Sequence, residues 1–438
     1  MKLVSGVNNC IVISRWTQQM LALLVLLILV QMNAKAGAVA LYGFDYVEVR
    51  ESSIEAEPGG LEQPLPDNAD YDQQLEQLET DAGPYADGLS EPLASLARYH
   101  LEQGDFSQAL TNYRRAIHVV RINDGLYHPR QIPLVRNLLS VYRRSGDMVG
   151  LDESYEYFFR LYGSARPPYT DIRMKATLEY LRWQREATVL GLDDTPARRL
   201  QAAYRLNQEV LEALGSSVAV SYHWYRDLVV SQLRNLYLLQ AQVPEYDDSY
   251  VLTQPAAAMS SQSQLMNFDQ QRLTNLRRNS FSNGRLLLEQ LVHRAGLTRD
   301  SVALAAAWLE SGDWYQFNSN RRSAVDAYTA AIVALEGEDE ETLLSEWFDQ
   351  PVALPATMLL RSPNNPKTAE SRRLTADYEV DSRGYARNVQ VHESGVNPGN
   401  EAARLRRLLS STRFRPRYVA GSAVSSEGVQ RDYELLGP

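Results

Sequence analysis

The stretch from Glu91 to Arg121 contains two amphipathic helical segments joined at Gly104-Asp105. Its apolar residues recur at intervals of three and four, which is the spacing that places them on one face of a helix. The first stripe is Leu93, Leu96, Ala97, His100 and Leu101, and the second is Phe106, Ala109, Leu110, Tyr113, Ala116 and Ile117. A glycine in the left-handed conformation ends a helix, and an aspartate can cap the next one. The stretch therefore predicts an antiparallel helical hairpin.

The hairpin pattern recurs twice more along the chain. About 42 residues later the same offsets hold Leu138, Leu139, Tyr142, Gly146-Asp147, Leu151, Tyr155 and Phe158. A third copy carries Trp308, Gly312, Tyr315, Ala324, Tyr328 and Ala331. A helical pair with one apolar face becomes stable by stacking against similar pairs, so recurrence predicts a solenoid rather than an isolated hairpin.

These spacings resemble the tetratricopeptide repeat, in which Trp, Leu-Gly and Tyr are followed by Ala, an aromatic residue and Ala. The resemblance implies a tetratricopeptide-like helical repeat domain over residues 68–345, with the first helix of each pair lining the concave side. An unrelated bundle of helical hairpins is the alternative, because Leu, Ala and Tyr stripes serve any helical core. The expected fold is mostly α, a helical solenoid followed by a small α+β domain.

The N-terminal residues 1–36 have the organisation of a signal peptide. Lys2 and Arg15 precede an apolar run of about 13 residues, which is shorter than the ~20 needed to span a bilayer. Ala34-Lys35-Ala36 supplies the small-x-small pattern of a cleavage site. Cleavage predicts a periplasmic protein. If the apolar segment extends back to include 10–16, it is instead an uncleaved inner-membrane anchor that faces the periplasm. Only in that case is a membrane a partner.

Three further segments lack apolar periodicity. Residues 37–67 are acidic and interrupted by Gly and Pro, which predicts a solvated linker. Residues 242–269, rich in Ser, Gln, Pro and Ala, predict a disordered loop within the repeat domain. Residues 346–371 are punctuated by proline and predict a second linker. Residues 168–242, which precede the predicted loop, carry helical stripes that continue the solenoid.

The last segment, residues 372–438, changes from helical to strand periodicity. Leu374, Ala376, Tyr378 and Val380 alternate with polar residues, and so do Val389 and Val391. A basic amphipathic helix over 401–411 and strands over 415–419 and 429–435 complete the order β-β-α-β-β. This order resembles the C-terminal domain of the energy transducer TonB. The matching residues are Val380, Asp381, Gly384, Asn388-Val389, Arg413-Phe414-Arg415-Pro416 and Gly421. The chain departs from that family in lacking a long Pro-Lys spacer and an intramembrane histidine.

Composition argues against several kinds of chemistry. The formal net charge of −10 disfavours nucleic acid as a partner, since phosphate binding requires clustered Lys and Arg. Cys10 is the only cysteine, and no two of the six histidines have metal-ligand spacing, so no metal or other cofactor is expected. Phosphate-binding loops and nucleophile motifs are also missing from the sequence. The chain is therefore interpreted as non-enzymatic, with a hydrolase of envelope polymers as a distant alternative.

Binding is the function that remains. Arg98 on the first hairpin and Arg136, Asn137, Arg143 and Arg144 on the second are spaced to grip the carboxylates or backbone of a partner peptide. The alternative is that these side chains are solvated or pair with neighbouring acids. The edge of the C-terminal sheet offers a second surface, for an added strand or for a homodimer. The resulting hypothesis is a periplasmic adaptor for protein partners in the cell envelope. The other reading is a membrane-anchored TonB-like transport component that contacts outer-membrane receptors.

Overall fold

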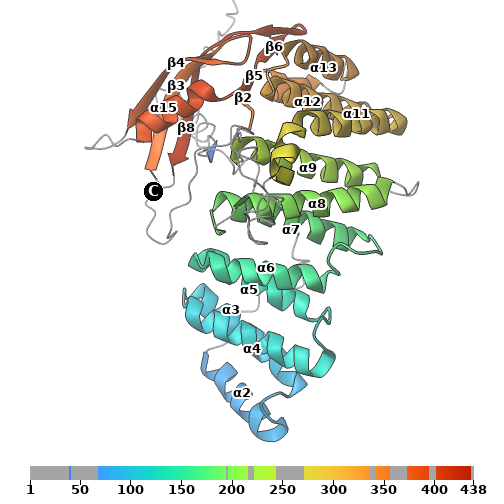
Figure 1. The fold of residues 1–438 in the computed structure, drawn as a ribbon. Helices are drawn as coiled ribbons and strands as arrows, with labels where there is room; N and C mark the ends of the chain where they lie inside the picture. Colours follow the sequence, from blue (N-terminus) through green and yellow to red (C-terminus); the bar gives the residue numbers. More distant parts are fainter. Residues whose placement is uncertain are drawn as a thin grey trace, which may run out of the picture.

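The structure is a computed structural model, and it describes residues 39–40, 68–193, 196–215, 221–242, 271–335, 341–355, 372–393 and 401–435. Its helices stack in pairs from α2 at one end to α13 at the other, and the C-terminal sheet packs beside the last pairs (Figure 1). The signal peptide (1–36), the rest of the acidic linker (37–67) and nearly all of the loop predicted at 242–269 lie outside the described residues.

The first two predicted hairpins are confirmed. Helix α2 (Asn68–Ala82) and a short 3-10 turn (Asp87–Leu89) lead into α3 (Ser90–Glu102) and α4 (Phe106–Asp124), followed by α5 (Gln131–Ser145) and α6 (Met148–Leu161). Gly104 and Gly146 have φ of 78° and 74°, the left-handed region that a side chain disfavours. Asp105 and Asp147 then accept hydrogen bonds from the N–H groups of Gln108 and Gly150, at 3.1 and 3.0 Å. Each turn thus ends one helix and caps the next.

The stripes at 168–242 form three long helices, α7 (Asp171–Val189), α8 (Pro196–Gly215) and α9 (Tyr222–Gln242). Residues 271–278 are helical and lead into α11 (Ser280–Thr298). One continuous core of Leu, Ala, Tyr and Trp side chains runs from α2 to α12. Consecutive pairs therefore share their apolar faces, as a solenoid requires.

The third predicted hairpin consists of α12 (Ser301–Phe317) and α13 (Arg321–Ala334). Its turn is made by Asn318, Ser319 and Asn320, with Ser319 at φ 60°, and the Asn320 side chain caps α13. Gly312 therefore differs from Gly104 and Gly146, because it lies inside α12. A Cβ atom at position 312 would lie 2.4 Å from the ring of Tyr328. Gly312 therefore allows α12 and α13 to pack closely.

The C-terminal domain is the expected small α+β unit. Strands β3 (Arg372–Val380), β4 (Ala386–Glu393) and β8 (Ser426–Leu435) form an antiparallel sheet in the order β8-β3-β4, and the two residues of β1 (Val39–Ala40) pair with β8. Helix α15 (Glu401–Ser411) covers one face of it. The alternating apolar residues of β3 are buried under this helix, where they pack against Leu405, Leu408 and Leu409. They are Leu374, Ala376, Tyr378 and Val380.

The strand predicted at 415–419 is divided at Pro416, and neither part belongs to the main sheet. Strand β5 (Phe414–Arg415) pairs with β2 (Val352–Ala353), and β6 (Arg417–Val419) pairs with β7 (Ser422–Val424). Proline has no N–H to donate to a ladder, which accounts for the break. The predicted linker at 346–371 also begins inside α14 (Glu341–Phe348) and includes β2, so its first residues join the two domains.

The two domains meet through an aromatic cluster and a set of polar contacts. Tyr418 of β6 packs edge-on against Tyr328 of α13 and Phe348 of α14. The amide of Gln316 on α12 donates to the carbonyl oxygens of Arg383 and Phe414, at 2.7 and 2.9 Å. These contacts fix the C-terminal domain against the last helical pair.

Candidate binding groove

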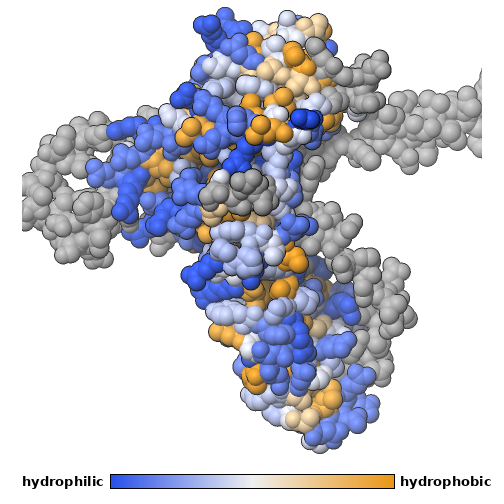
Figure 2. Space-filling model, turned by 90° about the vertical axis from the view of Figure 1, so that its right-hand side faces the viewer, coloured by the Kyte–Doolittle hydropathy of each residue, from blue (hydrophilic) through white to orange (hydrophobic). Residues whose placement is uncertain are grey.

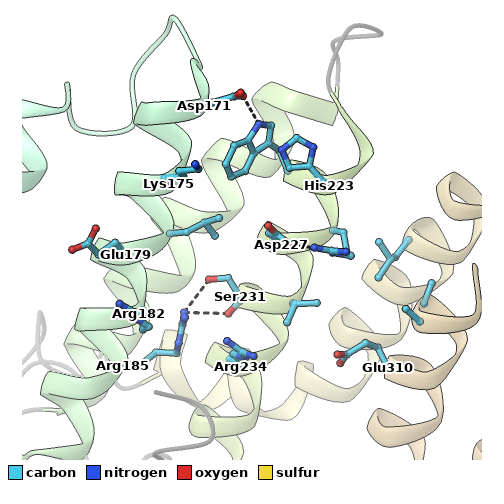
Figure 3. A pocket seen from close by; sticks show the side chains of 17 residues that line it. Asp171, Lys175, Glu179, Arg182, Arg185, His223, Asp227, Ser231, Arg234 and Glu310 are labelled. Atoms are coloured by element: carbon cyan, nitrogen blue, oxygen red, sulfur yellow. Dashed lines mark hydrogen bonds and ion pairs between the residues drawn. The ribbon is translucent and has the colours of Figure 1, made fainter. Parts of the chain in front are cut away.

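A groove of about 760 Å³ runs across the first helices of three successive pairs. Helix α7 forms one wall, α9 the floor, and α12, with Leu291 of α11, the other wall (Figure 3). The groove is thus formed by the first helices of the pairs, as the sequence predicts for a binding surface. It lies on later pairs than α3 and α5, which carry the predicted site residues. Its lining includes five basic and four acidic side chains, in a chain whose net charge is −10.

The most unusual group in the groove is Arg185, which is 2% exposed. Its Nη1 donates to the hydroxyl of Ser231 at 2.9 Å and to Asn235 Oδ1 at 3.2 Å, both neutral acceptors. Its Nε is buried without a hydrogen-bond partner. Burial, and then the charges of Arg234 and Arg182, lowers the pKa of Arg185. A buried cation is costly unless a carboxylate or another anion compensates it.

Two of the acidic side chains that line the groove are paired with other arginines, and the pKa of a third is raised. Glu179 accepts from Arg136 at 3.3 Å, and Asp227 pairs with Arg226 at 2.7 Å. Burial, followed by the carboxylate of Asp313, raises the pKa of Glu310 on the opposite wall. The guanidinium groups of Arg182, Arg185 and Arg234, all labelled in Figure 3, form a cluster in the groove, and the described hydrogen bonds of Arg185 include no carboxylate.

The other end of the groove is aromatic and polar. Trp224 is 8% exposed, and its indole N–H donates to Asp171 Oδ1 at 2.7 Å, which ties the first turns of α9 and α7 together. The ring of His223 lies 4.4 Å from that of Trp224, and Lys175 stands on the adjacent wall. An extended chain in the groove would meet an aromatic surface at one end and guanidinium groups at the other.

The site residues expected from the sequence lie on the neighbouring part of the same helix face, and two of them are used within the fold. Arg136 bonds to Glu179 and to the hydroxyl of Tyr162, and Arg143 makes two hydrogen bonds to Glu186, at 2.6 and 3.0 Å. Burial alone would lower the pKa of Arg143, but its bonds to Glu186 raise it. These pairs connect α5 to α7.

The other three expected residues are exposed. Arg98 and Arg144 stand on the surfaces of α3 and α5, and Asn137 makes a side-chain hydrogen bond with Tyr113. The structure therefore does not gather the five into one pocket. Peptide binding by Arg98, Arg136, Asn137, Arg143 and Arg144 stays a prediction, with Arg98, Asn137 and Arg144 the members whose side chains are exposed.

Sequence reasoning missed the guanidinium cluster. A local signal existed, because Lys175, Arg182 and Arg185 are separated by seven and three residues, which places them on one helix face. Arg226 and Arg234 have an equivalent spacing of eight. The local sequence pattern, however, does not predict that α7, α9 and α12 line one groove.

The described residues give no indication of a metal site or a membrane span. Among them, no group of three or more His, Cys, Asp and Glu side chains could hold a metal ion. None of the helices in the described ranges combines the length and apolarity needed to cross a bilayer. The face drawn in Figure 2 is largely hydrophilic, with hydrophobic residues in small groups. Scattered apolar residues of this kind are normal on a protein surface.

The described residues form a tetratricopeptide-like solenoid of paired helices, followed by a small α+β domain. No protein-family model and no curated protein matches the sequence. Among solved structures, the chain is similar to nearly identical TPR-like repeats of a kinesin light chain from Podosopora anserina. That match has 15% identity over 56% of this chain and 93% of the other, with a TM-score of 0.33. BtubC (BKLC) from P. vanneervenii is similar at 14% identity, over 61% and 87% of the two chains, with a TM-score of 0.31.

Proposed function

We propose that this protein is a non-enzymatic interaction scaffold whose repeat domain binds an acidic segment of a partner protein. The groove across α7, α9 and α12 is the binding site, and the guanidinium cluster of Arg182, Arg185 and Arg234 receives a carboxylate. Guanidinium groups bind carboxylates through paired, charge-assisted hydrogen bonds, which gives both affinity and orientation.

The observation that carries this proposal is the buried charge of Arg185. Elsewhere on the same helix face a partly buried arginine, Arg143, is matched by Glu186. Arg185 has only Ser231 and Asn235 as hydrogen-bond partners in the described chain. A ligand carboxylate would supply the anion that is missing, and it would also offset the repulsion from Arg234.

The test uses an array of short peptides that vary in the number and position of Asp and Glu. The tightest binder is then compared with a twin in which every carboxylate is replaced by an amide. We expect the acidic peptide to bind at least about tenfold more tightly, since a charge-assisted hydrogen bond contributes about 1.5–3 kcal/mol. Arg234→Gln should remove that preference, because its half-buried side chain lines the groove without packing in the core.

The matched control is Arg205→Gln on α8, where Arg205 is exposed and lies outside the groove lining. It should leave binding unchanged. If the tightest peptides carry no carboxylate, or if Arg205→Gln and Arg234→Gln weaken binding equally, the groove is not an acidic-peptide site.

The location and the second partner are also part of the proposal. The apolar run and the Ala34-Lys35-Ala36 pattern support export to the periplasm, and an N-terminus at Gly37 in the mature protein would test it. Strand β4 stands at one edge of the described sheet, which supports strand addition by a second partner or a homodimer there. Recovery of the chain with Met1 intact would favour the anchored, TonB-like alternative.

A further inference from the structure

A second pocket, of about 310 Å³, lies where the two domains meet. The repeat domain contributes Gln316, Ser319 and Arg321 from the end of α12 and the start of α13. The C-terminal domain contributes Arg383, Arg387 and Arg413, together with the ring of Tyr385. The pocket shares no lining residue with the groove, so it carries an inference independent of the proposed function.

Four guanidinium groups line this pocket, and in the described chain a carboxylate bonds to one of them. Arg387 Nε is 3.2 Å from Asp381 Oδ2. Arg321, Arg383 and Arg413 make no ion pair with any described residue, so the pocket and Asp381 together have a net charge of about +3. Like charges so close together repel one another unless an anion lies between them.

Two of the four guanidinium groups, those of Arg387 and Arg413, are held in place before any ligand binds. That of Arg413 lies 4.2 Å from the centre of the Tyr385 ring, and that of Arg387 lies 5.7 Å from it. The Nε of Arg413 is buried and has no hydrogen-bond partner. Stacking on an aromatic ring orients a guanidinium through its face, so that its edge can bind an anion. Arg413 Nη1 donates to the carbonyl oxygen of Ser411 at 3.4 Å and Arg387 Nε to Asp381, while no described hydrogen bond uses Nη2 of Arg413.

The backbone around the pocket is fixed as well. Asp381 Oδ1 accepts from the N–H groups of Arg383 and Tyr385, both at 3.0 Å, which closes the β3–β4 turn. Gln316 binds the carbonyl oxygen of Arg383 and so holds this turn against α12. Ser319 and Arg321 flank Asn320, the N-cap of α13, so the positive end of that helix dipole adds to the field.

We propose that this pocket binds a phosphate-type oxyanion and that the bound anion links the repeat domain to the C-terminal domain. A single carboxylate would neutralise only part of a charge near +3, whereas a phosphoryl or pyrophosphoryl group offers two or more charges and several acceptor oxygens. Its binding would connect Arg321 on one domain with Arg383 and Arg413 on the other.

The test is isothermal titration of the full chain with sodium pyrophosphate, against sodium chloride at matched ionic strength. Arg321→Gln and Arg383→Gln change exposed side chains, so both variants should fold. We expect each to weaken pyrophosphate binding about tenfold or more, as for the loss of a charge-assisted hydrogen bond. Arg205→Gln, remote on α8, should bind as the unaltered chain does, and pyrophosphate should raise the unfolding temperature of the unaltered chain and of Arg205→Gln only.

A parallel titration with glycerol phosphate and inorganic phosphate separates the sources of the anion. If glycerol phosphate binds more tightly than inorganic phosphate, the natural ligand is a phosphoryl group attached to a larger molecule. If inorganic phosphate binds more tightly, the natural ligand is a free anion. The proposal is overturned if pyrophosphate binds no better than chloride, or if Arg205→Gln reduces binding as much as Arg321→Gln and Arg383→Gln do.

Discussion

The packing of Gly312 gives a prediction whose sign can be worked out from the structure. Replacing it with alanine would put a Cβ atom 2.4 Å from Cδ1 and Cε1 of Tyr328, whereas carbon atoms in contact normally lie about 3.5–4 Å apart. One of the two must therefore move by about 1 Å. Gly296→Ala on α11 is the matched control, because a Cβ atom there would meet nothing within 4 Å.

The ring of Tyr328 cannot move freely. It is 1% exposed, its hydroxyl donates to Asp313 at 2.8 Å, and it packs against Phe348 and Tyr418 at the domain junction. Overpacking of this kind costs about 1–3 kcal/mol, while alanine in place of glycine within a helix gains up to about 1 kcal/mol. Because the ring is held on several sides, the overpacking cost lies in the upper part of its range, at about 2–3 kcal/mol. After the gain in helix propensity we therefore expect Gly312→Ala to destabilise the chain by about 1–2 kcal/mol. Gly296→Ala should stabilise it by about 0.5–1 kcal/mol.

Urea unfolding followed by circular dichroism measures both effects, as opposite shifts of the transition midpoint. A Gly312→Ala chain as stable as the unaltered one would show that α12 and α13 are not packed this closely. The two helices would then pair in a different register.

Three further outcomes are expected. Asp147→Ala removes the cap of α6 and should cost about 1 kcal/mol, measured as a lower urea midpoint. Gln316→Ala leaves the carbonyl oxygens of Arg383 and Phe414 without their donor, so hydrogen exchange in the β3–β4 turn should speed up several-fold while α3–α6 are unaffected. Burial tends to raise the pKa of Asp381, but backbone N–H groups and a guanidinium outweigh it and lower the pKa. The stability from Asp381 is then full above its unfolded pKa of about 3.9 and is lost as pH falls through the folded value. Asp381→Asn should accordingly flatten the fall of the urea midpoint below about pH 4.

Local signals in the sequence account for most of the secondary structure. The stripes in Glu91–Arg121, the Gly-Asp turns and the alternation in β3 depend only on residues a few positions apart, and the structure confirms them. The prediction of one continuous strand over 415–419 was wrong. Pro416 ends the pairing of β5 with β2, and the residues after it pair with β7. Pairing partners lie far along the chain, so residue type alone does not select them.

The sequence by itself determined that helical pairs repeat, where they end, and that a strand-containing unit follows them, since periodicity and capping act over one or two turns. Only the tertiary structure decided which arginine charges are neutralised by a nearby carboxylate. Arg136 and Arg143, expected in a binding site, meet Glu179 and Glu186 some 43 positions away, while Arg185 receives no carboxylate. The charge state of a surface depends on distances between stacked helices, and those distances exist only once the apolar faces have packed.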